Sequence, residues 1–285
     1  MKLIVDSGST KTDWISLSKE GKLIFETHTL GLNPQVLDEH IIEERIINNY
    51  ELYQNRKKIT HLFFYGAGCG TEPPKELIKK VFESIFINAS INVKEDTYAA
   101  VFSAAKKGEK SIVSIIGTGS NCTYFDGENI LQKVTSLGYV LMDDASGNYF
   151  GRQMIRDYFF EKMPDDISEK FSKSFELNPN NIKDKLYKKP NPNTYLAKFA
   201  KFIVENKEKK YCSDLIKKGF NLFITNQIEQ FEDCKKIPLH FIGSISFYLK
   251  DELNECLINR GMNLGNVLKK PIDGLVNYHL KYNSN

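Results

Sequence analysis

The first candidate for chemistry is a short turn that follows the first apolar run of the chain. Asp6 comes directly after Lys2–Val5, and residues 7–12 read Ser-Gly-Ser-Thr-Lys-Thr. Small residues and hydroxyls allow such a turn to bring several backbone N–H groups close to one phosphate. The pattern predicts a phosphate-binding turn, with Asp6 facing the metal ion of Mg–ATP, made of Asp6, Gly8, Ser9, Thr10, Lys11 and Thr12. It lacks the GxxxxGK[ST] pattern and is not a Walker P-loop, so a plain hairpin turn is the alternative.

Two further glycine-containing turns follow apolar runs. Gly117, Thr118, Gly119 and Ser120 come directly after Ser111–Ile116, in the same strand context as the first turn. Gly243 and Ser244 stand between the run Leu239–Ile242 and a helical pattern. Glycine permits close approach of a backbone to a ligand, and a helix N-terminus favours phosphate. The three turns together predict a nucleotide site, although each alone is also compatible with an ordinary connection.

Carboxylates mark two other places. Asp96 precedes the small-residue helix expected at Thr97–Ala105, where an N-cap is the ordinary role and a general base for a sugar hydroxyl is the catalytic one. Asp143 and Asp144 lie in the turn Met142–Gly147. That turn could hold sugar hydroxyls or a metal ion, or it could cap a helix that starts at Tyr149.

The elements around these turns repeat one plan. Both halves of the chain begin with a strand, a Gly/Ser/Thr turn, a strand, a Gly turn and a third strand, and helical patterns dominate from Asn148 onward. Two copies of one motif predict two related lobes that face each other, with the junction near Lys106–Lys110. The expected domains are an N-terminal lobe of residues 1–108 and a C-terminal lobe of residues 109–285. The last helix, about residues 272–285, is expected to pack back on the N-terminal lobe. Helical spacing is also read over Val36–Asn55, Thr194–Asn206 and Lys210–Phe231.

Composition narrows the class of protein. The 285 residues are 41% hydrophobic and carry a formal net charge of +3, too small to make nucleic acid the expected partner. On that ground we expect no nucleic-acid partner. No signal-peptide pattern or membrane span is expected either, so we expect no membrane partner and predict a cytoplasmic protein. The five cysteines are far apart and form no CxxC pair, which favours reduced core thiols over a metal or iron–sulfur site.

The ordered set of motifs resembles a known superfamily. DSGSTKT, GAG, EDTYAA, GTGS, the Asp143–Asp144 turn and GS follow one another as in sugar kinases, actin and heat-shock chaperone ATPases. Within it the chain is similar to the BadF/BadG/BcrA/BcrD ATPase family, which includes N-acetylglucosamine kinases. The likeness extends over nearly the whole chain. It implies an α/β fold of two actin-like (ribonuclease H-like) lobes, with a nucleotide and sugar cleft between them.

The resemblance also implies a role for each matched residue. Asp6 to Thr12 would form the first phosphate loop with Asp6 toward Mg²⁺, Gly117 to Ser120 the second, and Gly243 with Ser244 the adenosine motif. Asp96 occupies the place of the catalytic base. The residues expected at the sugar are Asn33, Gly66, Asp96, Gly138, Tyr139 and Asp143. The implied reaction is transfer of the γ-phosphoryl group of ATP to an amino sugar, most simply to the 6-hydroxyl of N-acetylglucosamine.

One departure from the family pattern keeps alternatives open. The family reads GDEGS where this chain reads Met142-Asp143-Asp144-Ala145-Ser146. Met and Ala do not tolerate every backbone conformation that Gly adopts. The alternatives are a BadF-type ATPase that activates a partner, and a non-catalytic sugar or nucleotide sensor with the kinase fold. A homodimer is open as well.

Overall fold

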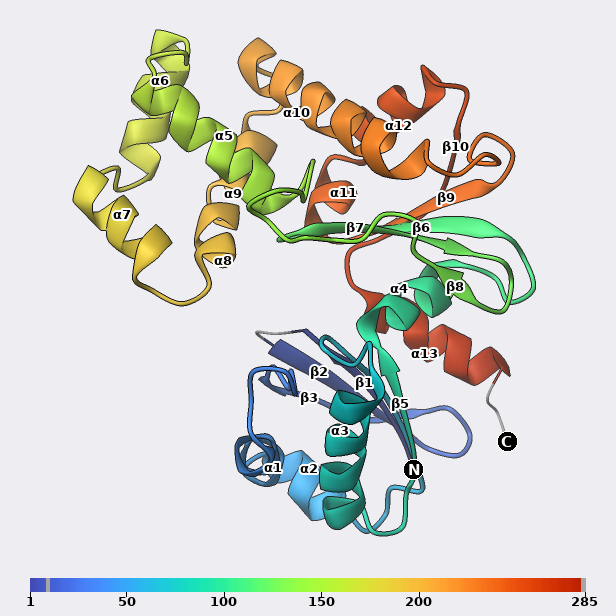
Figure 1. Ribbon diagram of the computed structural model, residues 1–285. Helices are drawn as coiled ribbons and strands as arrows, with labels where there is room; N and C mark the ends of the chain where they lie inside the picture. The colour runs from blue at the N-terminus through green and yellow to red at the C-terminus, as the bar shows by residue number, and fades with distance from the viewer. Residues whose placement is uncertain (9–10, 283–285) are drawn as a thin grey trace. The chain divides into compact units, whose positions relative to one another are not determined.

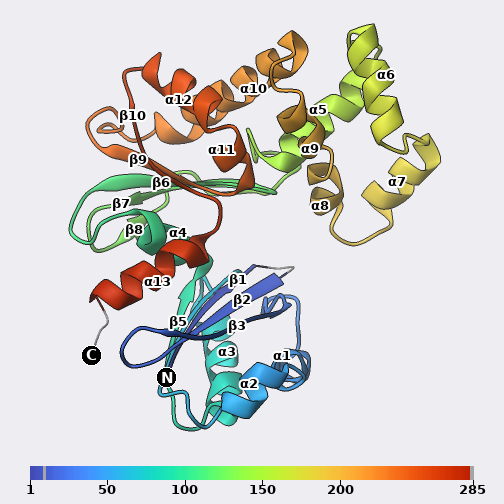
Figure 2. The same ribbon diagram turned by 180° about the vertical axis from the view of Figure 1, so that it is seen from behind.

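The computed structural model describes residues 1–8 and 11–282, which form two compact units (Figures 1 and 2). Unit 1 consists of Met1–Ser103 together with the segment that begins at Lys270. Unit 2 consists of Ala104–Lys269.

Unit 1 is built on a five-stranded sheet with the order β3-β2-β1-β4-β5. The strands are β1 Lys2–Ser7, β2 Lys11–Leu17, β3 Leu23–Leu30, β4 His61–Gly66 and β5 Ser90–Glu95. β1, β2 and β3 form an antiparallel meander, whereas β4 and β5 run parallel to β1. β1 is central, and accordingly Leu3, Ile4 and Val5 are all fully buried.

Helices cover both faces of this sheet. They are α1 Glu39–Ile47, α2 Tyr50–Asn55, α3 Glu72–Ile85, α4 Asp96–Ala104 and α13 Pro271–Tyr282. α1, α2 and α3 pack on the face that carries Trp14 and Phe64. α4 and α13 pack on the other face, where Leu275 joins Ile4 and Tyr65. Hydrophobic burial on two faces explains why Leu3, Ile4 and Val5 of β1 are consecutive apolar residues rather than alternating with polar ones.

Unit 2 repeats the same sheet plan with the order β10-β9-β6-β7-β8. Its strands are β6 Ser111–Ile116, β7 Ser120–Phe125, β8 Ile130–Leu131, β9 Pro238–Ile242 and β10 Asn263–Leu268. β6, β7 and β8 pair antiparallel, and β9 and β10 run parallel to β6. The prediction of an α/β fold with two similar lobes is therefore confirmed.

The helices of unit 2 pack together in one hydrophobic core. They are α5 Gly147–Phe159, α6 Asp165–Ser174, α7 Pro179–Tyr187, α8 Pro192–Ala197, α9 Ala200–Glu205, α10 Lys210–Phe223, the π-helix η1 Ile224–Ile228, α11 Ser244–Tyr248 and α12 Lys250–Ile258. Aromatic residues from several of them, including Phe150, Phe171 and Phe220, are fully buried in one cluster. All five cysteines are free and buried, as expected of core thiols. Within the described residues no helix is both long and apolar enough to cross a bilayer.

Several sequence-based boundaries were wrong. The pattern read over Val36–Asn55 is two helices, because the Asn49 side chain accepts from the N–H of Leu52 and starts α2 anew. The patterns over Thr194–Asn206 and Lys210–Phe231 are likewise divided, the second by a π-helical turn. α7 and β10 were not anticipated. Apolar spacing continues across such breaks, so periodicity alone does not locate them.

Candidate active site

Asp6 and Asp96 lie at the same edge of the unit 1 sheet. β1 pairs in parallel with β4, and β4 with β5, so that Ser7 stands beside Gly66 and Gly66 beside Glu95. Asp6 is the penultimate residue of β1, and Asp96 follows β5 as the first residue of α4. The carboxyl ends of parallel strands meet at one edge, which is the usual place for ligand-binding groups in α/β sheets.

The surroundings raise the pKa of both carboxyl groups. For Asp6 desolvation is the largest cause, the charges of Asp96 and Asp13 add to it, and the pKa rises to about 7 although Lys270 opposes the effect. The pKa of Asp96 rises to about 6, first through desolvation and then through Glu95, against backbone hydrogen bonds at the start of α4. Such values suit a proton acceptor at neutral pH, and the excess negative charge around Asp6 suits a cation.

The turn between β1 and β2 is closed at its base. The N–H of Gly8 donates to the carbonyl of Lys11 at 3.0 Å, and the ammonium of Lys11 lies 2.6 Å from the carboxylate of Asp13. Ser9 and Thr10, both expected at the phosphate, lie outside the described residues. Thr12 is fully buried, and its hydroxyl bonds to Ser7 and to the carbonyl of Leu30. In the described part of the turn Gly8 and Lys11 are exposed, but the Gly8 N–H and the Lys11 ammonium are engaged within it, and the Thr12 side chain faces inward.

The expected sugar residues of unit 1 are fixed by tight packing. The Oδ1 atom of Asn33 accepts from the N–H of Gln35 at 2.9 Å. Gly68 has φ +83°, and a Cβ there would lie 2.1 Å from that same Oδ1. A Cβ on Gly66 would lie 2.2 Å from the ring of Phe64. Only glycine fits at either position, and for Gly66 the packing of Phe64 is a sufficient reason.

In unit 2 the second glycine turn lies against the start of α5. The N–H of Gly147 donates to the carbonyl of Gly117 at 2.7 Å. The carbonyl of Thr118 accepts from both the backbone N–H and the side-chain amide of Asn148, at 3.0 and 2.7 Å. These bonds anchor the turn to the start of α5, whose first N–H groups are used in holding it.

The Asp143 turn touches the same place. The amide of Asn148 donates to a carboxylate oxygen of Asp143 at 2.8 Å, and the hydroxyl of Ser120 donates to the carbonyl of Asp144 at 2.8 Å. A Cβ on Gly119 would lie 2.7 Å from the Asp143 carboxylate. The structure therefore brings Gly117–Ser120 and Asp143 into contact within unit 2.

Ala145 explains what the departure from the family pattern does locally. Ala145 keeps the left-handed conformation, with φ +59°, that a glycine would adopt there. Ser146 then caps α5 by accepting from the N–H of Tyr149 at 3.2 Å. The backbone conformation that glycine favours is thus retained at a non-glycine residue, with an energetic cost of about 1–2 kcal/mol for the left-handed region.

Gly243 joins these turns from the end of β9. It has φ +124°, and a Cβ there would lie 2.3 Å from the carbonyl oxygen of Ile116, next to Gly117. Ser244 is exposed and is the first residue of α11. Tyr139 and Gly138 stand apart in the segment before the Asp143 turn: Arg152 donates to the carbonyl of Tyr139 at 3.0 Å, and Gly138 accepts from the N–H of Met142 at 2.9 Å.

The sequence analysis did not single out Asn148, and it placed Ser7 within the first phosphate loop without predicting its hydrogen bonds. Asn148 bonds both the glycine turn and Asp143, and Ser7 bonds Thr12 and the N–H of Leu32. A polar residue at the start of a helix gave a weak signal for Asn148. Ser7 gave none, because its partners lie 5 and 25 residues away along the chain.

Comparison with known proteins shows which solved structures share this fold. No family model matches the chain. A protein from Porphyromonas gingivalis, provisionally named an N-acetylglucosamine kinase, is 34% identical, with a TM-score of 0.92 over 99% of this chain and 100% of that one. One from Chromobacterium violaceum with the same provisional name is 14% identical, with a TM-score of 0.72 over 97% and 98%. A ROK-family glucokinase from Streptomyces griseus, solved with glucose and AMPPNP, is 13% identical, with a TM-score of 0.56 over 99% and 100%.

These similarities show that the chain is a two-unit α/β protein with the fold of sugar kinases. The chain belongs to the actin-like sugar kinase superfamily, since the Porphyromonas gingivalis protein is 34% identical over nearly its whole length. Membership of the narrower BadF/BadG/BcrA/BcrD family stays a prediction.

Proposed function

We propose that this chain is an ATP-dependent kinase that transfers the γ-phosphoryl group to the 6-hydroxyl of N-acetylglucosamine. The observation that carries the proposal is the register of β1, β4 and β5, which supports a joint role for Asp6 and Asp96 at one sheet edge. The raised pKa of each carboxyl group agrees with that role.

Asp96 is the proposed catalytic base. Its carboxylate would accept the proton of the attacking sugar hydroxyl as the oxygen bonds to the γ-phosphorus and the bond to the ADP oxygen breaks. A base with a pKa of about 6 is mostly ionised at pH 7 and still accepts a proton readily. Phosphoryl transfer needs little covalent chemistry from a protein, so the rest of the catalysis would come from positioning and charge.

Asp6 is the proposed residue for Mg²⁺. Its pKa is raised first by desolvation and then by the charges of Asp96 and Asp13, and a divalent cation beside the carboxylate would offset both effects. Magnesium is usually held by one or two carboxylates together with substrate phosphates, whose charge it neutralises. Within the described residues no group of three or more His, Cys, Asp or Glu side chains is arranged for a metal ion.

The nucleotide and sugar residues follow the sequence prediction. Gly8 and Lys11 of unit 1 and Gly117–Ser120 of unit 2 are the proposed phosphate contacts, and Gly243 with Ser244 the adenosine contacts. Asn33, Gly66, Gly138, Tyr139 and Asp143 are the proposed sugar contacts. The name of the Porphyromonas gingivalis protein supports N-acetylglucosamine as the sugar.

The activator alternative finds no support in the cysteines. All five are buried, and burial raises the pKa of each thiol. A neutral buried thiol is a poor cluster ligand. A non-catalytic sensor with the same fold would bind sugar or nucleotide without transferring phosphate, so only a measurement of turnover separates it from a kinase.

The test is a coupled assay of ADP release with Mg–ATP and a panel of amino sugars and neutral hexoses. We expect N-acetylglucosamine to give the highest kcat/KM, with the product identified as the 6-phosphate by mass spectrometry and NMR. Binding of a sugar without release of ADP would favour the sensor, and ADP release that no sugar raises would favour the partner-activating ATPase.

A further inference from the structure

A chain of buried hydroxyl groups joins the β1–β2 turn to the segment after β3. The N–H of Leu32 donates to the hydroxyl oxygen of Ser7 at 3.1 Å, and the Ser7 and Thr12 hydroxyls lie 2.8 Å apart. Thr12 in turn donates to the carbonyl of Leu30 at 3.2 Å. Since Thr12 donates its one proton to Leu30, Ser7 is the donor between the two hydroxyls, at 2.8 Å, and the carbonyl of Gly8, at 3.5 Å, is its more distant alternative acceptor.

In this series of hydrogen bonds the hydroxyls of Ser7 and Thr12 each accept one bond and donate one. The series starts at a backbone N–H and ends at a backbone carbonyl only two residues earlier, at Leu32 and Leu30, and so forms a closed loop. Ser7 and Thr12 are also cross-strand partners that flank the turn at Gly8. Hydrogen bonds arranged in such series strengthen one another, and a buried group left without its partner is costly.

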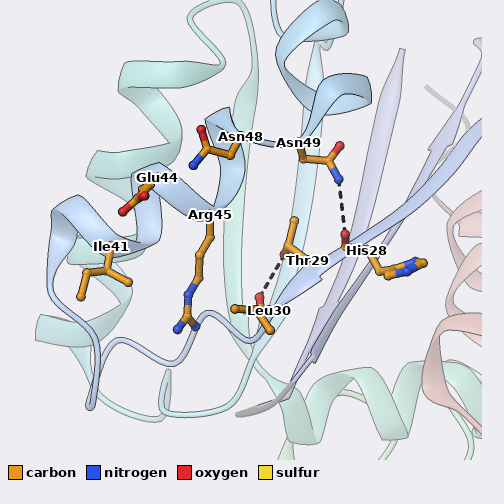
Figure 3. A pocket seen from close by; sticks show the side chains of 8 residues that line it. All are labelled: His28, Thr29, Leu30, Ile41, Glu44, Arg45, Asn48 and Asn49. Atoms are coloured by element: carbon orange, nitrogen blue, oxygen red, sulfur yellow. Dashed lines mark hydrogen bonds between the residues drawn. The ribbon is translucent and has the colours of Figure 1, made fainter.

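The same segment is held from its other side by α1. A guanidinium N–H of Arg45 donates to the carbonyl of Gly31. Figure 3 shows Arg45 extending from α1 toward the end of β3, where Leu30 lies, in a hollow of about 410 Å³. The backbone of residues 30–32 is therefore held at three successive carbonyl or N–H groups, immediately before Asn33.

We infer that Ser7 is a positioning residue that couples the proposed phosphate turn to the proposed sugar residue Asn33. A change in the turn on nucleotide binding would act on Ser7 and Thr12, and through them on the backbone that places Asn33. This inference rests on the proposed function, because it takes the turn as the phosphate site and Asn33 as a sugar contact. Ser7 itself touches neither reactant.

The test is the coupling between the two ligands, measured by calorimetry. The dissociation constant of N-acetylglucosamine is determined for the full-length protein in the presence of Mg²⁺, once with AMPPNP and once without it. Coupling free energies of this kind typically change affinity by about 5- to 150-fold. In Ser7→Ala we expect the sugar dissociation constant with AMPPNP to rise about fivefold or more, the equivalent of one ordinary hydrogen bond. The ratio of the two constants should fall toward 1.

Ser16 provides the matched control. It lies on β2 and is fully buried like Ser7, but within the described part of the chain its hydroxyl has no hydrogen-bond partner. Ser16→Ala makes the same chemical change and should leave both sugar constants and their ratio unchanged. Ser7→Cys, which keeps the volume but weakens both bonds, replaces Ser7→Ala should the latter not fold.

The outcomes separate the two proposals. A wild-type protein that binds no sugar overturns the proposed function and this inference with it. A wild-type protein that binds sugar with no dependence on AMPPNP overturns the inference alone. The same holds if Ser7→Ala matches Ser16→Ala, or if it weakens binding equally with and without AMPPNP, as a purely structural role would.

Discussion

Replacing Asp6 by Asn should make the metal-free protein more stable at alkaline pH. In the folded protein the pKa of Asp6 is about 7, above the ordinary 3.8 of an aspartate, so the native state holds this proton more tightly than the unfolded chain does. The contribution of Asp6 to stability is therefore complete below about pH 4 and is lost as the pH rises through 7. At pH 8 the wild type carries a partly buried negative charge that Asn lacks.

The size of the effect follows from the pKa difference. A rise from 3.8 to about 7 corresponds at most to about 4 kcal/mol above pH 7. Since Asn still buries an amide, we expect about half of this, about 2 kcal/mol. For a protein of this size that raises Tm by roughly 5 °C.

The assay is thermal unfolding with a chelator present at pH 8 and at pH 5. Asp6→Asn should gain stability at pH 8 and less than half as much at pH 5. Asp126→Asn is the control of opposite sign, because backbone hydrogen bonds from Asn129 and Glu128 lower the pKa of Asp126 in an exposed turn. An Asp6→Asn protein that is no more stable than wild type at pH 8, or that gains as much at pH 5, would refute the reasoning.

Three further outcomes are expected. The kcat/KM of the wild type should rise with pH through an apparent pKa of about 6, because Asp96 must be ionised to accept a proton, and a profile flat from pH 5 to 8 would argue against this role. Gly243→Ala should lower the free energy of unfolding by about 3 kcal/mol or more, and Gly261→Ala by only about 1 kcal/mol, because both residues have positive φ but only a Cβ on Gly243 would clash. Equal losses in urea unfolding would contradict the close packing of Gly243 against Ile116. Gly68→Ala should raise the KM for sugar by about tenfold while leaving that for ATP nearly unchanged, because its Cβ displaces Asn33, and an unaltered KM for sugar would remove Asn33 from the site.

The fold could be predicted largely because it is repeated. Two copies of a strand–turn–strand–turn–strand pattern carry strong turn signals, and the second copy supports the reading of the first. The helical region was harder, because apolar spacing runs on through the breaks at Asn49 and after Phe223. A cap such as Asn49 is one side chain among many polar ones and gives little signal beforehand.

The candidate site was predictable only where a residue carries its role in its own type and place. Asp6 and Asp96 stand at strand ends and were found. Ser7 lay within the predicted loop, but its role was not predicted, because that role comes from a hydrogen bond to Leu32, which only the folded chain brings near. The effect of Ala145 also required the backbone, since the sequence gives the substitution but not its φ of +59°.

The most direct measurement of the central claim is the turnover of Asp96→Asn with N-acetylglucosamine and Mg–ATP. Asn is close to Asp in size and can accept the same backbone hydrogen bonds at the start of α4, so fold and sugar affinity should persist while kcat falls by about 100-fold or more. Asp165→Asn, at the first position of α6, changes the same residue type at the same helix position and should leave kcat unaltered. A stable Asp96→Asn protein with near-normal kcat would contradict the account.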